Sequence, residues 1–276
     1  MKKILHIKKP SKRAAGMGFV NSITSAALLC GVMSVLFSAS GNFYMGALLI
    51  LGAMILDGLD GTTARLLKAE SQFGAEFDTF VDITAFGLAP AMLVYFYLFH
   101  DFGPLTGLGV QTGHGIHTLG ALLGVAIVLS GALRLARFKV VDTDHGMGGY
   151  TGMPITVNAL CLAGIVLFIE AWKKGYGADT LPAWVNLQDG GWLSWVMYIN
   201  CIICLLLQVS PFKYPKPTNT PLGQFIGVLA FLGLFIGPKT AVVSCCYLVP
   251  VTLFFIYVAP FWFTIKKRWT AKRQAA

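Results

Sequence analysis

Residues 57–82 read DGLDGTTARLLKAESQFGAEFDTFVD and place four aspartates at the junction of two long apolar segments. Asp57 and Asp60 are spaced i, i+3, and Asp78 and Asp82 are spaced i, i+4. In two helices each pair would therefore project from one face. A charged side chain at the centre of a membrane helix costs about 2.5–3.5 kcal/mol on insertion scales, so residues of this kind indicate a functional site.

The four carboxylates are predicted to converge. If their helices form an antiparallel hairpin that turns near residues 69–71, Asp57 lies at the depth of Asp82 and Asp60 at the depth of Asp78. Convergent carboxylates repel one another unless cations lie between them, and all-oxygen sites favour hard ions such as Mg²⁺ or Mn²⁺. The sequence therefore predicts two divalent metal ions, which together would bind phosphate oxygens during displacement at phosphorus.

The remainder of the chain has the composition of a membrane protein. Of its 276 residues 56% are hydrophobic and only 12% are charged, and the mean hydropathy is +0.70. A helix that spans a bilayer needs about 20 apolar residues. The stretches without Lys, Arg, Asp or Glu that approach or exceed this length are 14–56, 83–100, 102–133, 190–212, 218–238 and 240–265.

An all-α fold is predicted, a polytopic membrane bundle of about eight transmembrane helices. The first apolar stretch holds two of them because the polar turn residues 38–42 interrupt it. The predicted helices cover residues 18–37, 43–68, 73–99, 117–138, 153–172, 191–210, 221–237 and 241–264.

The distribution of basic residues predicts the orientation, because Lys and Arg favour the cytoplasmic side. With eight helices and a cytoplasmic N-terminus, all of the 21 Lys and Arg except Lys173, Lys174 and Lys239 fall on the cytoplasmic side. We therefore expect a cytoplasmic-membrane protein with both termini and the aspartates facing the cytoplasm. The net charge of +9 then reflects topology, and no nucleic-acid partner is expected.

Small residues surround the aspartates, namely Gly58, Gly61, Ala64 and Gly74. They would let a flat base and a diphosphate approach the helix backbones, although close helix packing is an alternative reason for each glycine. Arg65 could bind phosphate or base oxygens with its planar fork of donors, or could only anchor the helix at the cytoplasmic surface.

The run from Asp57 to Arg65, followed by Gly74, Asp78 and Asp82, resembles the signature of the CDP-alcohol phosphotransferases. The resemblance implies a homodimer with a six-helix catalytic core and a cavity open to the cytoplasm. It also implies two metal ions bound by the four aspartates, with Asp82 acting in addition as the catalytic base. The small residues and Arg65 would then bind CDP. An alcohol deprotonated by Asp82 would attack the donor phosphate in line, and CMP would leave.

Three further segments, residues 85–90, 131–138 and 152–154, resemble the bacterial and archaeal phosphatidylserine synthase branch of that family. This implies CDP-diacylglycerol as the donor and L-serine as the acceptor. Arg134 and Arg137 could receive the serine carboxylate or the diphosphate, or could serve only as topological anchors. Glycerol 3-phosphate, inositol phosphate and choline are alternative acceptors. A cation transporter is the alternative from another class of protein. A transporter would be expected to carry charges spread along a transmembrane path, whereas the four aspartates here are predicted to converge.

These interpretations divide the chain into four parts. Residues 1–16 form a basic juxtamembrane amphipathic segment that could bind anionic lipid headgroups, or act as a plain topogenic tail. Residues 17–210 form the CDP-alcohol phosphotransferase core. Residues 211–265 add two transmembrane helices, and residues 266–276 form a basic cytoplasmic tail.

Overall fold

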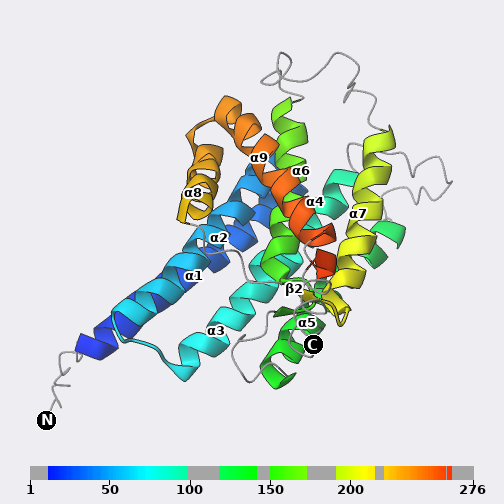
Figure 1. The fold of residues 1–276 in the computed structure, drawn as a ribbon. Coiled ribbons are helices and arrows are strands. Elements are labelled where there is room, and N and C mark those ends of the chain that lie inside the picture. The colour runs from blue at the N-terminus through cyan, green and yellow to red at the C-terminus, as the bar shows by residue number, and fades with distance from the viewer. Residues whose placement is uncertain are drawn as a thin grey trace, which may run out of the picture.

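The computed structural model describes residues 12–98, 118–141, 150–172, 191–214, 221–258 and 260–262. Within these ranges the chain is almost entirely helical, and the helices run up and down in one bundle (Figure 1). The elements are α1 (Lys12–Ala39), α2 (Phe43–Leu66), α3 (Gln72–Asp82), the π-helical segment η1 (Ile83–Leu88), α4 (Ala89–Phe96), α5 (Thr118–Val141), β1 (Tyr150–Thr151), α6 (Ile155–Ala171), α7 (Gly191–Val209), β2 (Lys213–Tyr214), α8 (Pro221–Ile236) and α9 (Pro238–Tyr257). The predicted all-α membrane bundle is confirmed.

Each of the eight predicted helices is found within the described ranges. The third is one continuous rod, Gln72–Phe96, in which η1 joins α3 to α4. The first begins at Lys12 instead of residue 18. In the described part of the chain five helices are long and apolar enough to cross a membrane, and α6, α7 and α8 contain shorter apolar helices. The protein is therefore a multi-pass membrane protein.

A tight turn joins α1 to α2 and keeps these helices side by side. Gly41 in the turn has a φ of +81°, a backbone conformation that glycine adopts without strain. Asn42 caps α2 by accepting a hydrogen bond from the backbone N–H of Met45 at 3.2 Å. Ser34 on α1 donates to the carbonyl oxygen of Gly46 on α2 at 2.8 Å. This contact fixes the height of one helix against the other.

The connection from α2 to α3 is also short and capped. The backbone N–H of Ala69 donates to the carbonyl of Ala64 at 2.9 Å and closes the end of α2. Ser71 is the N-cap of α3 and accepts from the N–H of Gly74 at 3.0 Å. The predicted hairpin with its turn near residues 69–71 is confirmed, and it places the ends of α2 and α3 that carry aspartates next to each other.

The core of the bundle centres on α6, which is buried along most of its length. It packs against α2, α4 and α9, and α9 crosses its outer side in Figure 1. Residues such as Leu162 and Leu167 are fully buried there. The helix α2, which carries Asp57 and Asp60, thus packs directly against this buried helix.

A two-stranded antiparallel ladder ties the start of α6 to the end of α7. Tyr150 of β1 pairs with Tyr214 of β2. Gly152 follows β1 with a φ of +77°, and its backbone N–H donates to the carbonyl of Phe212 at 2.8 Å. The N–H of Met153 reaches the carbonyl of Leu207 at 3.1 Å. The Gly-Met-Pro segment singled out in the sequence is therefore a fixed joint between two helices.

Candidate active site

Three of the four aspartates form a compact cluster. Asp57 and Asp60 from α2 and Asp78 from α3 each offer a carboxylate oxygen, and these oxygens lie within 4.8 Å of one another. Within the described ranges no other group of three His, Cys, Asp or Glu side chains comes this close. The hairpin brings together side chains that the sequence separates, as its spacing predicted.

Asp82 adjoins this cluster without belonging to the group of three. Its carboxyl group lies near that of Asp57. One oxygen of Asp78 and one of Asp82, in each case Oδ1, are buried without a hydrogen-bond partner among the described residues. Because buried polar atoms normally have a partner, these oxygens indicate a ligand that binds between the helices. Carboxylate oxygens are the donors that hard divalent cations prefer, so the residues present fit a metal ion.

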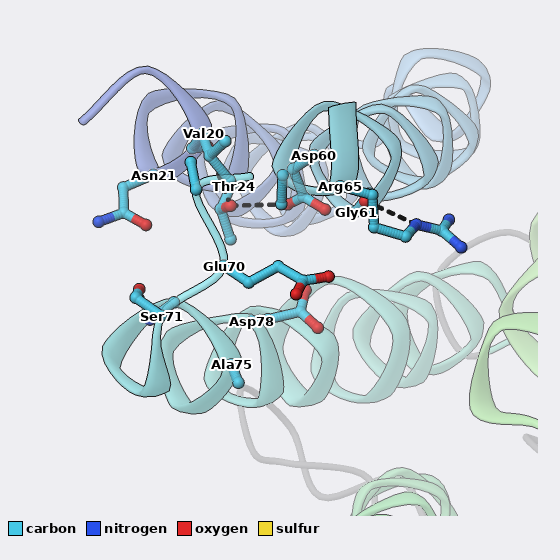
Figure 2. A pocket seen from close by; sticks show the side chains of 13 residues that line it. Val20, Asn21, Thr24, Asp60, Gly61, Arg65, Glu70, Ser71, Ala75 and Asp78 are labelled. Atoms are coloured by element: carbon cyan, nitrogen blue, oxygen red, sulfur yellow. Dashed lines mark hydrogen bonds between the residues drawn. The ribbon is translucent and has the colours of Figure 1, made fainter. Parts of the chain in front are cut away.

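The neighbouring helix α1 also contributes to the cluster. The Thr24 hydroxyl donates a hydrogen bond to Oδ2 of Asp60 at 2.6 Å (Figure 2). Both side chains are buried. Sequence reasoning missed Thr24, because it is an uncharged residue within a long apolar run. The only signal that could have identified Thr24 is its position, because it is a polar residue that faces α2 near the depth of the aspartates.

A cavity of about 280 Å³ opens between α1, α2 and α3 beside the cluster (Figure 2). Asp60 and Asp78 line it, as do the residues Gly61, Ala64, Arg65 and Gly74 that the sequence assigned to nucleotide binding. Gly58, which shares that assignment, is not among its lining residues. The cavity therefore collects four of the five residues predicted to bind CDP.

Two glycines leave free space around the α2 motif. A Cβ atom added at Gly58 or Gly61 would meet no atom within 4 Å among the described residues. Helix packing therefore does not require either glycine, whereas approach of a ligand to the backbone would. The Arg65 side chain folds back so that its Nε donates to the Gly61 carbonyl at 3.1 Å (Figure 2).

The two arginines of α5 are directed to different places. Arg134 is buried and lies close enough to Asp82 to interact with its charge. Arg137 donates through Nη1 to the carbonyl oxygens of Val209 at 3.2 Å and Ser210 at 3.4 Å. These contacts place a positive charge at the C-terminal end of α7, where it is favourable. Arg134 thus adjoins the aspartates while Arg137 joins α5 to α7, and the acceptor-binding role of both stays a prediction.

An ion pair connects α5 to the first turns of α3. Nζ of Lys139 lies 2.6 Å from Oε2 of Glu76, and both side chains are exposed. Lys139 also lies close enough to Asp78 for the two charges to attract each other. Because exposed ion pairs contribute about 0–1 kcal/mol, this contact supports the position of α3 only weakly.

The sequence matches the family model for CDP-alcohol phosphatidyltransferase over residues 17–206. The chain belongs to this family. The resemblance predicted from residues 57–82 is confirmed, and so is the prediction that the protein is an enzyme, because the CDP-alcohol phosphatidyltransferase domain is catalytic. All four aspartates lie within the matched range, as do the cavity residues and Arg134.

Similar proteins include several named CDP-diacylglycerol–serine O-phosphatidyltransferase. The one from Helicobacter pylori is 32% identical over 227 residues, covering 81% of this chain and 84% of its own. The one from Mycobacterium leprae is 30% identical over 276 residues, covering 96% of this chain and 81% of its own. The one from Methanocaldococcus jannaschii is 27% identical over 223 residues, covering 81% and 86%. The similarity therefore extends over most of the chain.

Proposed function

We propose that this enzyme transfers the phosphatidyl group of CDP-diacylglycerol to the hydroxyl of L-serine, forming phosphatidylserine and CMP. The observation that carries the proposal is the convergence of Asp57, Asp60 and Asp78 beside a cavity of about 280 Å³. Relatives from three organisms carry the name of this reaction, which favours serine over glycerol 3-phosphate, inositol phosphate or choline.

The nucleotide of the donor binds in the cavity between α1, α2 and α3. Gly61, Ala64 and Gly74 keep its walls small, so that a base and a diphosphate can approach the backbone closely. Arg65 lies at the same cavity, and its guanidinium offers several N–H donors to phosphate oxygens. Gly58, with open space around it, extends this small surface along α2.

The four aspartates, Asp57, Asp60, Asp78 and Asp82, hold two divalent metal ions, Mg²⁺ or Mn²⁺. When bound, such ions neutralise phosphate oxygens and stabilise the charge that develops during in-line displacement. The buried and unpartnered Oδ1 atoms of Asp78 and Asp82 support this assignment.

Asp82 accepts the proton of the serine hydroxyl. As that oxygen bonds to the phosphorus attached to diacylglycerol, the proton moves to the Asp82 carboxylate and the phosphorus–oxygen bond to CMP breaks. A positioned carboxylate of this kind contributes about 10²–10⁴-fold to a rate. The buried guanidinium of Arg134 lies close to Asp82 and attracts the serine carboxylate, which brings the hydroxyl to its base.

The enzyme resides in the cytoplasmic membrane with both termini and the active site on the cytoplasmic side, and it forms a homodimer. The positive-inside distribution of Lys and Arg supports this orientation. The basic segment 1–16 binds anionic lipids; its residues 1–11 lie outside the described ranges. The catalytic core is residues 17–210, to which residues 211–265 add α8 and α9, followed by the basic tail 266–276.

An acceptor panel tests the reaction. Purified protein in lipid nanodiscs receives CDP-diacylglycerol, Mg²⁺ or Mn²⁺, and one acceptor at a time: L-serine, glycerol 3-phosphate, inositol phosphate or choline. Released CMP and the lipid product are measured by chromatography and mass spectrometry, with the Asp78→Asn variant as an inactive control. We expect phosphatidylserine with serine alone, and no product after chelation of divalent ions. Turnover with another alcohol and none with serine would refute the acceptor assignment.

A further inference from the structure

A hydroxyl group from α1, a helix outside the motif, contacts the aspartate cluster. Oγ1 of Thr24 on α1 lies 2.6 Å from Oδ2 of Asp60 on α2. The exposed fractions of the two residues are only 4% and 5%, so the contact is largely shielded from bulk solvent. The contact is short enough for a charge-assisted hydrogen bond from a hydroxyl to a carboxylate.

The Thr24 hydroxyl has a second possible acceptor, and the distances show which one it serves. The carbonyl oxygen of Val20, one turn earlier in α1, lies 3.2 Å away. A hydroxyl carries a single proton, so the closer and charged acceptor, Asp60, receives it. Hydroxyls in helices commonly bond their own backbone instead, as Thr79 does at 2.9 Å to the carbonyl of Ala75.

The contact fixes the rotation of the Asp60 carboxylate. With Oδ2 held by Thr24, the Asp60 carboxylate keeps one orientation in the cluster that it forms with Asp57 and Asp78. Hydrogen bonds that orient metal-binding carboxylates typically change metal affinity by about 10–100-fold when they are removed. We infer that Thr24 is a positioning residue that presents Asp60 to a divalent cation, an inference that rests on the proposed metal-dependent function.

The packing of α1 makes this hydroxyl a fixed donor. Ser34 holds α1 to the carbonyl of Gly46 on α2, and Gly31 of α1 lies directly against the backbone of Ala85 in η1. Thr24 lies in the same helix, N-terminal to both contacts. Its height against Asp60 is therefore set by the packing of α1 against α2 and η1.

Direct binding of Mn²⁺ tests the inference without any substrate. Electron paramagnetic resonance titrations of purified protein in nanodiscs compare wild type with Thr24→Val, which keeps the shape but removes the hydroxyl, and with Thr24→Ser, which keeps the hydroxyl. Thr79→Val is the matched control, because its hydroxyl bonds only its own helix among the described contacts. Thermal unfolding of the metal-free proteins is measured alongside, so that a change in fold is recognised.

We expect Thr24→Val to weaken Mn²⁺ binding about 10–100-fold, while Thr24→Ser and Thr79→Val bind as wild type. In turnover assays, excess Mn²⁺ should restore much of the activity of Thr24→Val. Wild-type affinity for Mn²⁺ in Thr24→Val would overturn the inference. A loss of affinity in Thr24→Ser as large as that in Thr24→Val would also overturn it. If Thr24→Val does not fold, Thr24→Ser alone decides: a loss of Mn²⁺ affinity in this variant overturns the inference. A wild type that binds Mn²⁺ but makes no phosphatidylserine would instead contradict the proposed function.

Discussion

Gly31 of α1 lies against the backbone of Ala85 in η1, so closely that a Cβ atom added at Gly31 would be 2.8 Å from the Cα of Ala85. Asp82 immediately precedes η1. We therefore expect Gly31→Ala to push α1 away from η1, to lower the free energy of unfolding by about 1–3 kcal/mol, and to reduce turnover. Thermal unfolding in detergent and CMP release measure the two effects.

The matched control for Gly31→Ala is Gly18→Ala on the same helix. A Cβ atom at Gly18 would meet no described atom within 4 Å, and alanine is favoured over glycine inside a helix by about 0.5–1 kcal/mol. Gly18→Ala should therefore be as stable as wild type or slightly more stable. Equal stability and activity in both variants would show that the contact between α1 and η1 does not position Asp82.

The sequence predicted the third span, as residues 73–99, but not its π-helical segment η1. Apolar composition alone predicts the span Gln72–Phe96, since the bilayer demands it. A π-helical segment, in contrast, is not fixed by apolar composition, and Gly31 of a different helix lies directly against η1. Such segments are frequent at functional sites, and η1 begins directly after Asp82.

The part of the candidate site that depends on charge and on residue spacing was predictable from the sequence. The i, i+3 and i, i+4 pairs and the hairpin turn were sufficient to predict the convergence of the aspartates. Arg134 and Arg137 are also spaced i, i+3 in one helix, yet Arg134 adjoins Asp82 and Arg137 bonds the end of α7. Long side chains on one face can diverge, and the neighbours that direct them come from distant sequence. Thr24 was missed for a related reason, because its partner Asp60 lies on another helix.

Asp82→Asn tests the assignment of the catalytic base. The amide keeps the size of the side chain but cannot accept the serine proton, so we expect turnover to fall about 10²–10⁴-fold or more. Binding of CDP, measured by calorimetry in the presence of Mg²⁺, should be largely retained, because the cavity is lined by Asp60 and Asp78 and not by Asp82. Near-normal turnover in this variant would exclude Asp82 as the base.

Gly61→Leu tests the nucleotide cavity. The added side chain would enter open space beside Asp60, so the fold should tolerate it while the donor is excluded. We expect a KM for CDP-diacylglycerol raised at least 10-fold and little change in the midpoint of thermal unfolding. Gly18→Leu is the control, because Gly18 also has open space around it but does not line the cavity. Unchanged KM in Gly61→Leu would place the nucleotide elsewhere.

Two glycines with positive φ separate backbone strain from steric conflict. Gly41 has a φ of +81° and Gly152 a φ of +77°. A Cβ atom at Gly41 would meet no described atom within 4 Å, whereas at Gly152 it would collide with the carbonyl oxygen of Gln208. Alanine at Gly41 should therefore cost only the strain of the left-handed conformation, about 1–2 kcal/mol.

Gly152→Ala should cost more, because the added methyl group must push the end of α7 away. That end is tied to α5, since Gln208 accepts a hydrogen bond from Ser130 at 2.6 Å and Arg137 donates to the next carbonyl. A displaced α7 would shift α5 and with it Arg134, which lies beside Asp82.

We expect Gly152→Ala to unfold at a lower temperature than Gly41→Ala and to show a raised KM for serine, measured by CMP release at saturating donor. Gly41→Ala should keep the wild-type KM for serine. Indistinguishable values in the two variants would show that the joint between β1 and α7 does not position the acceptor site.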